Sequence, residues 1–289
     1  MLAAILVSLR PAQWAKNLFV LAPLVFAQRL ADPAALLRAG LAFGAFCAAA
    51  SALYLVNDIG DRREDARHPL KRLRPIAAGR LPLVAAAAVA TALAMAAAGA
   101  GLRLGGPFLS LLGAYALLNL LYSAGLKRIV ILDVMAIGFG FLLRVAAGGA
   151  AIGVELSSWL LLCTIFLALF LAFSKRRHEL MLMQEQASEQ RSVLSHYSPA
   201  FLDQMINVVT ASTVVAYALY AVAPETARKF HGESLVYTVP FVLFGVFRYL
   251  YLMYQRPSRR NPTEAILRDP PFLINLLLWG LAAIWVIYS

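Results

Sequence analysis

The stretch YLVNDIGDRREDARHPLKRLRPIAAGR, residues 54–80, carries an apolar segment directly into a cluster of charge. It holds four acidic and seven basic residues, although only 14% of the 289-residue chain is charged. Asn57, Asp61 and Asp65 recur at intervals of four. On a continuing helix each step of four advances by about 40°, so the three side chains share one face. The stretch therefore indicates a helix that leaves an apolar environment and meets water with its oxygen-bearing side chains aligned.

The rest of the chain is strongly apolar. Hydrophobic residues make up 61% of it and the mean hydropathy is +0.73, whereas a soluble domain is about 45–50% apolar. A helix needs about 20 mainly apolar residues to cross a bilayer, and strand-like alternation is absent. We therefore predict an all-α integral membrane protein, a single polytopic domain over residues 1–289 with nine transmembrane helices. The predicted spans are 14–30, 38–57, 83–102, 107–123, 131–150, 157–174, 203–223, 234–254 and 271–288.

The net charge of +11 could indicate a nucleic-acid partner, but the distribution of the charge argues against one. If the N-terminus lies inside, nineteen of the 26 Lys and Arg residues fall in cytoplasmic segments and five on the opposite side. This is the positive-inside pattern of a multi-pass protein of the plasma or inner membrane. We predict that the N-terminus and the two longer loops, 58–82 and 175–202, are cytoplasmic, and that the C-terminus lies on the other side.

The three aligned side chains suit a metal ion. Mg²⁺ prefers oxygen ligands and often binds through one or two carboxylates together with substrate phosphates. Asn57, Asp61 and Asp65 are therefore candidate magnesium ligands and candidate catalytic residues for a reaction that releases diphosphate. The alternative is a solvated helix end at which Asp61 and Asp65 form salt bridges with neighbouring arginines.

Basic side chains follow the acidic ones at once. Lys71, Arg72 and Arg74 suit a magnesium diphosphate, because Lys supplies a point charge and Arg a bidentate fork for phosphate. Their charge also fits the positive-inside rule without any ligand. Tyr54 lies one turn deeper than Asn57, where its hydroxyl could reach a ligand or where its ring could anchor the membrane interface.

Other candidates are polar or cationic residues in or beside apolar segments. Arg144 lies within a predicted span, which indicates either an anionic pocket or an ion pair with another helix. Lys16 either points into the same cavity or extends to the interface. Lys175 either binds a ligand or forms an i,i+4 pair with Glu179. The remaining candidates are Tyr122, which shares a face with Asn119, and Lys127, which sits in the tight turn between two spans.

Taken together, these motifs resemble the UbiA superfamily of membrane prenyltransferases, whose signature begins N-x-x-x-D-x-x-x-D after the second span. That resemblance implies nine helices around a central cavity with charged loops at its cytoplasmic mouth. The longer stretches LRPAQWAKN, NDIGDRREDARHPLKRLRPIAAG, LYSAGLK and GFLLRVAAGG resemble the decaprenyl-phosphate phosphoribosyltransferase branch. The resemblance extends over essentially the whole chain.

One departure from the family pattern bears on the donor. Ordinary members carry a second D-x-x-x-D motif after the sixth span, but this chain has SKRRHEL at 174–180. The change favours a donor with an additional phosphate over a prenyl diphosphate. The branch implies Mg²⁺-dependent transfer of 5-phosphoribose from 5-phosphoribosyl 1-diphosphate to a polyprenyl phosphate, with release of diphosphate, in cell-wall biosynthesis.

The resemblance also implies roles for the candidate residues. Asn57 and Asp61 would bind magnesium, and Asp65 would complete or support that site. The phosphate and ribose groups would be held by Lys16, Tyr54, Lys71, Lys127 and Arg144, with Lys175 and Arg176 as additions and Arg72 and Arg74 behind them.

Two alternatives are open at this point. The first is a prenyltransferase that moves a prenyl group from its diphosphate to an aromatic acceptor. The second is a transporter or lipid-binding membrane protein without catalysis, since charges within spans also mark transport pathways. The gathering of charge at one face of the membrane speaks against a pathway through it.

Overall fold

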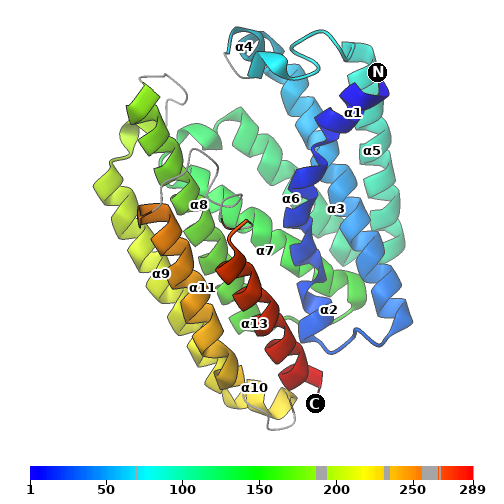
Figure 1. Cartoon of the computed structure of the whole chain (residues 1–289). Coiled ribbons are helices and arrows are strands. Elements are labelled where there is room, and N and C mark those ends of the chain that lie inside the picture. The colour runs from blue at the N-terminus through cyan, green and yellow to red at the C-terminus, as the bar shows by residue number, and fades with distance from the viewer. Residues whose placement is uncertain (69–70, 187–193, 231–234, 256–265, 267, 289) are drawn as a thin grey trace. The chain divides into compact units, whose positions relative to one another are not determined.

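In the computed structural model, the described part of the chain comprises residues 1–68, 71–186, 194–230, 235–255, 266 and 268–288. Within these ranges every regular element is a helix, and no strand occurs (Figure 1). Backbone contacts divide the chain into two compact units. The first unit contains residues 1–125 and 140–156, and the second contains residues 126–139 and 157–289. The long helix α7 (Leu132–Ile152) contributes to both.

The first unit is built around two long neighbouring helices, α3 and α5, which run side by side (Figure 1). Their contact rests on small side chains: Ala42, Ala45 and Ala97 share one buried cluster. Small residues let helix backbones approach closely, which is how helices associate in a bilayer. The elements of this unit are α1 (Leu2–Leu9), η1 (Pro11–Leu21), α2 (Ala22–Phe26), α3 (Pro33–Gly60), α4 (Arg62–Arg67), η2 (Lys71–Leu73), α5 (Leu83–Leu104), α6 (Gly106–Ala124) and the C-terminal part of α7.

The N-terminal segment runs antiparallel along the whole length of α3. It begins beside the α4 end of α3 and reaches α2 near the other end (Figure 1). As the segment advances along the chain, its partners on α3 have steadily lower residue numbers. They are Arg10 with Asp58, Trp14 with Ser51, Asn17 with Cys47, and Leu24 in one buried cluster with Ala35 and Ala39.

The second unit packs larger side chains. Helices α8 and α9 lie against each other, and Phe170, Phe173 and Ile206 lie in their shared core. The ring of Tyr249 from α11 packs against that of Phe170 at a tilt of 56°, with ring centroids 4.8 Å apart. The elements of this unit are η3 (Leu126–Arg128), the N-terminal part of α7, α8 (Ser158–Gln186), η4 (Leu194–His196), α9 (Pro199–Val222), α10 (Pro224–Lys229), η5 (Leu235–Thr238), α11 (Val239–Gln255) and α13 (Pro270–Tyr288).

Eight helices in the described residues are long and apolar enough to cross a membrane. They correspond to the second to ninth predicted spans, so the all-α, multi-pass prediction is confirmed. The first predicted span, 14–30, is formed by η1, α2 and a turn instead of one long helix. Its course along α3 favours a ninth crossing, and the count of nine stays a prediction.

Two predicted boundaries were wrong. Helix α3 starts at Pro33, five residues before the predicted start, because Asp32 caps it by accepting hydrogen bonds from the backbone N–H groups of Ala34 and Ala35. Those bonds are also the main reason why the pKa of Asp32 lies below its ordinary value. Helix α8 continues to Gln186, so the first part of the range 175–202, predicted as a loop, is helical. The part of that range at 187–193 lies outside the described residues.

Candidate functional site

The acidic end of α3 keeps part of the backbone pattern that the sequence indicates. The Asp61 N–H donates to the Asn57 carbonyl oxygen, and the Asp65 N–H donates to the Asp61 carbonyl oxygen, each at 2.8 Å. Helix α3 ends at Gly60, and Asp61 lies between it and the separate helix α4, so the shared face expected for the three side chains stays a prediction. The amide and carboxylate oxygens of Asn57 and Asp61 are donors of the kind that Mg²⁺ takes together with a bound diphosphate. Among the described residues no group of three His, Cys, Asp or Glu side chains is placed to hold a metal by itself.

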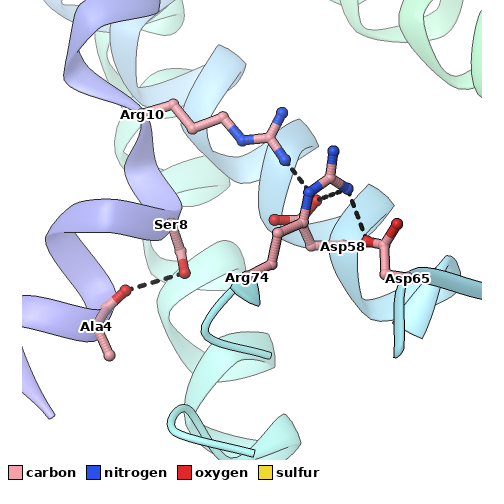
Figure 2. A network of polar contacts seen from close by, with 6 residues as sticks. All are labelled: Ala4, Ser8, Arg10, Asp58, Asp65 and Arg74. Atoms are coloured by element: carbon pink, nitrogen blue, oxygen red, sulfur yellow. Dashed lines mark hydrogen bonds and ion pairs between the residues drawn. The ribbon is translucent and has the colours of Figure 1, made fainter. Parts of the chain in front are cut away.

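A further acidic residue, Asp58, lies at the centre of an ion-pair network (Figure 2). Its side chain is only 2% exposed, and its Oδ1 accepts from Arg10 Nη2 at 2.6 Å and from Arg74 Nη1 at 3.0 Å. The same Arg74 nitrogen lies 2.7 Å from Asp65 Oδ2. The network ties the end of α1 and the loop that follows α4 to the end of α3.

This network bears on two of the candidate residues. Asp65 is buried and paired with Arg74, as the salt-bridge alternative expected for it, whereas Asp61 is partly exposed. Asp58 was not among the candidates, because it lies outside the spacing of four that links Asn57, Asp61 and Asp65. A signal was available in the polar pair Asn57–Asp58, which presents oxygens on two adjacent faces of the helix.

The other candidates near this end of the first unit differ in exposure. Tyr54 lies beneath Arg10, whose guanidinium carbon is 4.8 Å from the ring centroid. The Lys71 N–H donates to His68 Nδ1 at 3.2 Å. Burial, and next the charge of Lys71, hold the pKa of His68 below its ordinary value, which keeps that nitrogen an acceptor. Of the remaining candidates, Lys16 and Arg72 are exposed and Tyr122 is half-buried.

Arg144 lies deep within the first unit and is 7% exposed. Its guanidinium donates to Asn17 Oδ1 and to the Gly140 carbonyl at 2.8 Å, and to the Tyr115 hydroxyl at 2.9 Å. All three acceptors are neutral, and the structure gives this guanidinium no ion pair with a carboxylate among the described residues. The ion-pair alternative for Arg144 therefore has no support here.

A second buried network lies in the other unit, at the start of α7. Asp133 is fully buried and accepts from Arg176 Nε and from the Tyr197 hydroxyl, each at 2.7 Å. Burial raises the pKa of Tyr197 above its ordinary value, so the hydroxyl stays a proton donor. Arg176 also donates to Glu179 Oε2 at 2.7 Å and is only 1% exposed.

The two cationic candidates of the second unit have different surroundings. Lys175 is 41% exposed in its side chain, and its Nζ lies 3.8 Å from Glu179 Oε1. Lys127 is half-buried in the turn η3. The sequence predicts that both side chains lie with Lys71 at the cytoplasmic mouth of a cavity. Lys71 belongs to the other unit, so this stays a prediction.

Known proteins resemble this chain over most of its length. The family model described as "UbiA prenyltransferase family" matches residues 17–277. A relative from Corynebacterium glutamicum named decaprenyl-phosphate phosphoribosyltransferase is 35% identical, over 97% of this chain and 86% of its own length. One of the same name from Mycobacterium tuberculosis is 34% identical, over 96% of this chain and 92% of its own.

Solved structures share the fold at lower identity. A UbiA homologue from Archaeoglobus fulgidus, described as bound to GPP and Mg²⁺, superposes with a TM-score of 0.71 at 18% identity. The superposition covers 99% of this chain and all of that one. At this identity the likeness shows the fold.

Proposed function

Because the chain belongs to the UbiA prenyltransferase family, we propose that it transfers 5-phosphoribose from 5-phosphoribosyl 1-diphosphate to a polyprenyl phosphate and releases diphosphate. The observation that carries this proposal is the basic end of α8. Where the family pattern has a second acidic motif, this chain has Lys175, Arg176 and Arg177. Arg176 and Arg177 are paired with Asp133 and Asp203, so the carboxylates nearby are already neutralised. In the described part of the chain, no ligand set for the second metal of a prenyl-diphosphate site lies at this position.

The acidic end of α3 is the proposed site for the diphosphate. Asn57 and Asp61 would hold Mg²⁺, with Asp65 supporting the site through Arg74. A magnesium ion there would offset the negative charge that develops on the leaving diphosphate. The relative described as bound to GPP and Mg²⁺ supports this use of the fold. Lys71 and Arg72, on the loop that follows, would bind the diphosphate oxygens.

The buried guanidinium of Arg144 supports an anionic ligand inside the first unit. A charge within a membrane domain is costly unless an opposite charge or a polar cavity compensates it. Asn17, Tyr115 and the Gly140 carbonyl orient this guanidinium but supply no negative charge. A phosphate of the donor or of the lipid would supply it. We therefore assign Arg144 to a substrate phosphate, together with Lys16 and Tyr54 of the same unit.

The reaction requires positioning more than activation. The acceptor phosphate is an anion at neutral pH, so no general base is needed to generate the nucleophile. The chain's own residues would align the acceptor oxygen with C1 of the ribose and hold the charged groups that would otherwise repel each other. Lys127 and Lys175 would neutralise the 5-phosphate. The apolar chain of the acceptor would lie against lipid-facing helices, at the cytoplasmic face of the plasma or inner membrane.

A transfer assay tests the proposal. Detergent-purified protein is incubated with Mg²⁺ and labelled 5-phosphoribosyl diphosphate, with polyprenyl phosphate as acceptor. In parallel it is incubated with a labelled prenyl diphosphate and an aromatic acceptor. We expect label to enter the lipid in the first reaction and no product in the second. A prenylated aromatic product without transfer of phosphoribose would replace the proposal with the prenyltransferase alternative. The Asp61→Asn variant measures background in both reactions.

A further inference from the structure

The turn between α6 and α7 contains an unusual backbone conformation. Ile131 has a φ of 70°, in the left-handed region that β-branched residues avoid. It ends the short turn that carries Lys127 and opens α7, since its carbonyl accepts the N–H groups of Val134 and Met135. A strained residue persists only where its surroundings fix it. The question is which groups hold this turn.

The buried network at the start of α7 supplies them. The Ile131 N–H donates to the Tyr197 hydroxyl at 2.7 Å, and that hydroxyl in turn donates to Asp133 Oδ1 at 2.7 Å. The tyrosine ring is fixed by stacking on Phe201, with centroids 6.0 Å apart. A residue 66 positions away along the chain thus holds the backbone of the turn.

Arg176 completes the arrangement from α8. Its Nε donates to the second oxygen of Asp133, and its Nη1 donates to Glu179. At 1% exposure, this guanidinium is committed to internal partners. A side chain in this position is better placed to fix Asp133 than to contact a substrate.

We propose that Asp133, Tyr197 and Arg176 are positioning residues that hold the turn 126–131, and with it Lys127, in the conformation that binds the donor phosphate. The inference rests on the proposed function for the role of Lys127. It changes the role assigned to Arg176, which acts through Asp133 and does not touch the donor.

Tyr197→Phe is the sharpest test, because it removes one hydroxyl and keeps the stacked ring. Amide hydrogen exchange of the peptide containing residues 126–131 is measured in purified, donor-free protein. We expect faster exchange in the turn and donor binding at least threefold weaker than in wild type. Tyr217→Phe is the matched control. It removes a tyrosine hydroxyl that bonds Thr238 and Trp279 in the same unit, and it should leave both readouts unchanged.

A double variant links the network to Lys127. If the network acts by positioning Lys127, then Tyr197→Phe weakens donor binding in wild type but has no further effect in the Lys127→Ala background. Additive losses in the two backgrounds overturn the proposal, as does unchanged exchange in Tyr197→Phe.

Arg176→Lys separates the two roles of Arg176 while keeping its positive charge. A positioning role predicts faster exchange in the turn together with weaker donor binding. Weaker binding with wild-type exchange would mean direct contact with the donor and would overturn the proposal.

The proposed function fails in a different way, by absence of donor binding and phosphoribose transfer in wild type itself. Wild-type donor binding by Lys127→Ala would overturn the assignment of Lys127 and this proposal with it, even where exchange in the turn rises.

Discussion

At the scale of single residues, the acidic side chains at the end of α3 differ in what surrounds them. Asp58 and Asp65 are buried and share Arg74, whereas Asp61 is partly exposed between them in the chain. Removal of one partner of a buried ion pair leaves an uncompensated charge, which typically costs about 3–5 kcal/mol. Substitutions of Asp58 or Asp65 therefore affect stability as well as activity. Asp61 is the position at which the two effects separate best.

We expect Asp61→Asn to reduce transfer to background while the protein stays folded and monodisperse in detergent. The change removes a negative charge from the proposed metal site at nearly constant volume. Asp32→Asn is the matched control, because it makes the same change at the other end of α3, where Asn caps a helix as well as Asp does. Transfer at the wild-type rate by Asp61→Asn would exclude Asp61 from the mechanism.

We expect Lys127→Ala and Lys175→Ala to weaken binding of 5-phosphoribosyl diphosphate by at least tenfold. Loss of a charge-assisted hydrogen bond costs about 1.5–3 kcal/mol, which corresponds to roughly 10- to 150-fold. Lys127 should have the larger effect, since Glu179 lies 3.8 Å from Lys175 and already offsets part of its charge.

Affinity for polyprenyl phosphate should change less in both variants, because apolar burial dominates its binding. Arg103→Ala, which removes an exposed cation at the far end of α5, is the control. Donor affinity equal to wild type in both lysine variants would leave the basic loops as topology signals only.

At the scale of elements, the contact between η1 and α7 leaves no space for a side chain at Gly148. A Cβ there would overlap the Val20 carbonyl oxygen and lie 3.2 Å from Pro23 Cδ. Because the obstruction is backbone, it cannot be relieved by rotation of a side chain. The packing of the N-terminal segment in the first unit thus depends on one glycine.

We expect Gly148→Ala to lower the free energy of unfolding by about 1–3 kcal/mol, the usual cost of overpacking. The readout is thermal unfolding in detergent. Gly113→Ala, in the helix α6, is the control, since a Cβ there meets nothing within 4 Å and alanine is the better helix former. Equal melting temperatures for the two variants would contradict the close approach of η1 to α7.

Hydrophobic segments predicted most helix positions, but not where helices end in charged sequence. The segment 175–186, which begins with charged residues, continues α8. The ion pairs Arg176–Glu179 and Lys175–Glu179, at helical spacing, support it. A prediction that ends each span at its first charged residues does not take such pairs into account. The 3₁₀ conformation of Pro11–Leu21 likewise depends on contacts with α3, so no local pattern predicted it.

At the scale of the whole molecule, the sequence predicted the membrane class and the family motif, since both depend only on residues that are close together in the chain. It did not predict which cations are structural. Arg74 and Arg176 resemble phosphate ligands in sequence, yet they pair with Asp58, Asp65 and Asp133 from distant positions. Asn17 was not among the candidate residues, yet it accepts a hydrogen bond from Arg144, 127 residues away in the chain. These pairings depend on tertiary contacts.

The predicted orientation can be tested at the two ends of α3. Ala31 and Ala66 are both exposed and lie just outside it. In a variant without Cys47 and Cys163, an impermeant thiol reagent applied to intact cells should label Ala31→Cys. It should label Ala66→Cys only after lysis. Strong labelling of Ala66→Cys in intact cells would reverse the topology and place the acidic end of α3 outside the cytoplasm.

The pairing of a 3₁₀ helix with an α-helix has a metric consequence. Three residues of a 3₁₀ helix rise by about 6 Å, as do four residues of an α-helix. Trp14 and Asn17 are three residues apart, and their partners Ser51 and Cys47 are four apart. The two helices thus share one axial period over this interval. An α-helical segment of the same eleven residues would be about 5.5 Å shorter. The axial spacing of contacts on the N-terminal segment matches that on α3 because a 3₁₀ helix has fewer residues per turn and a larger rise per residue.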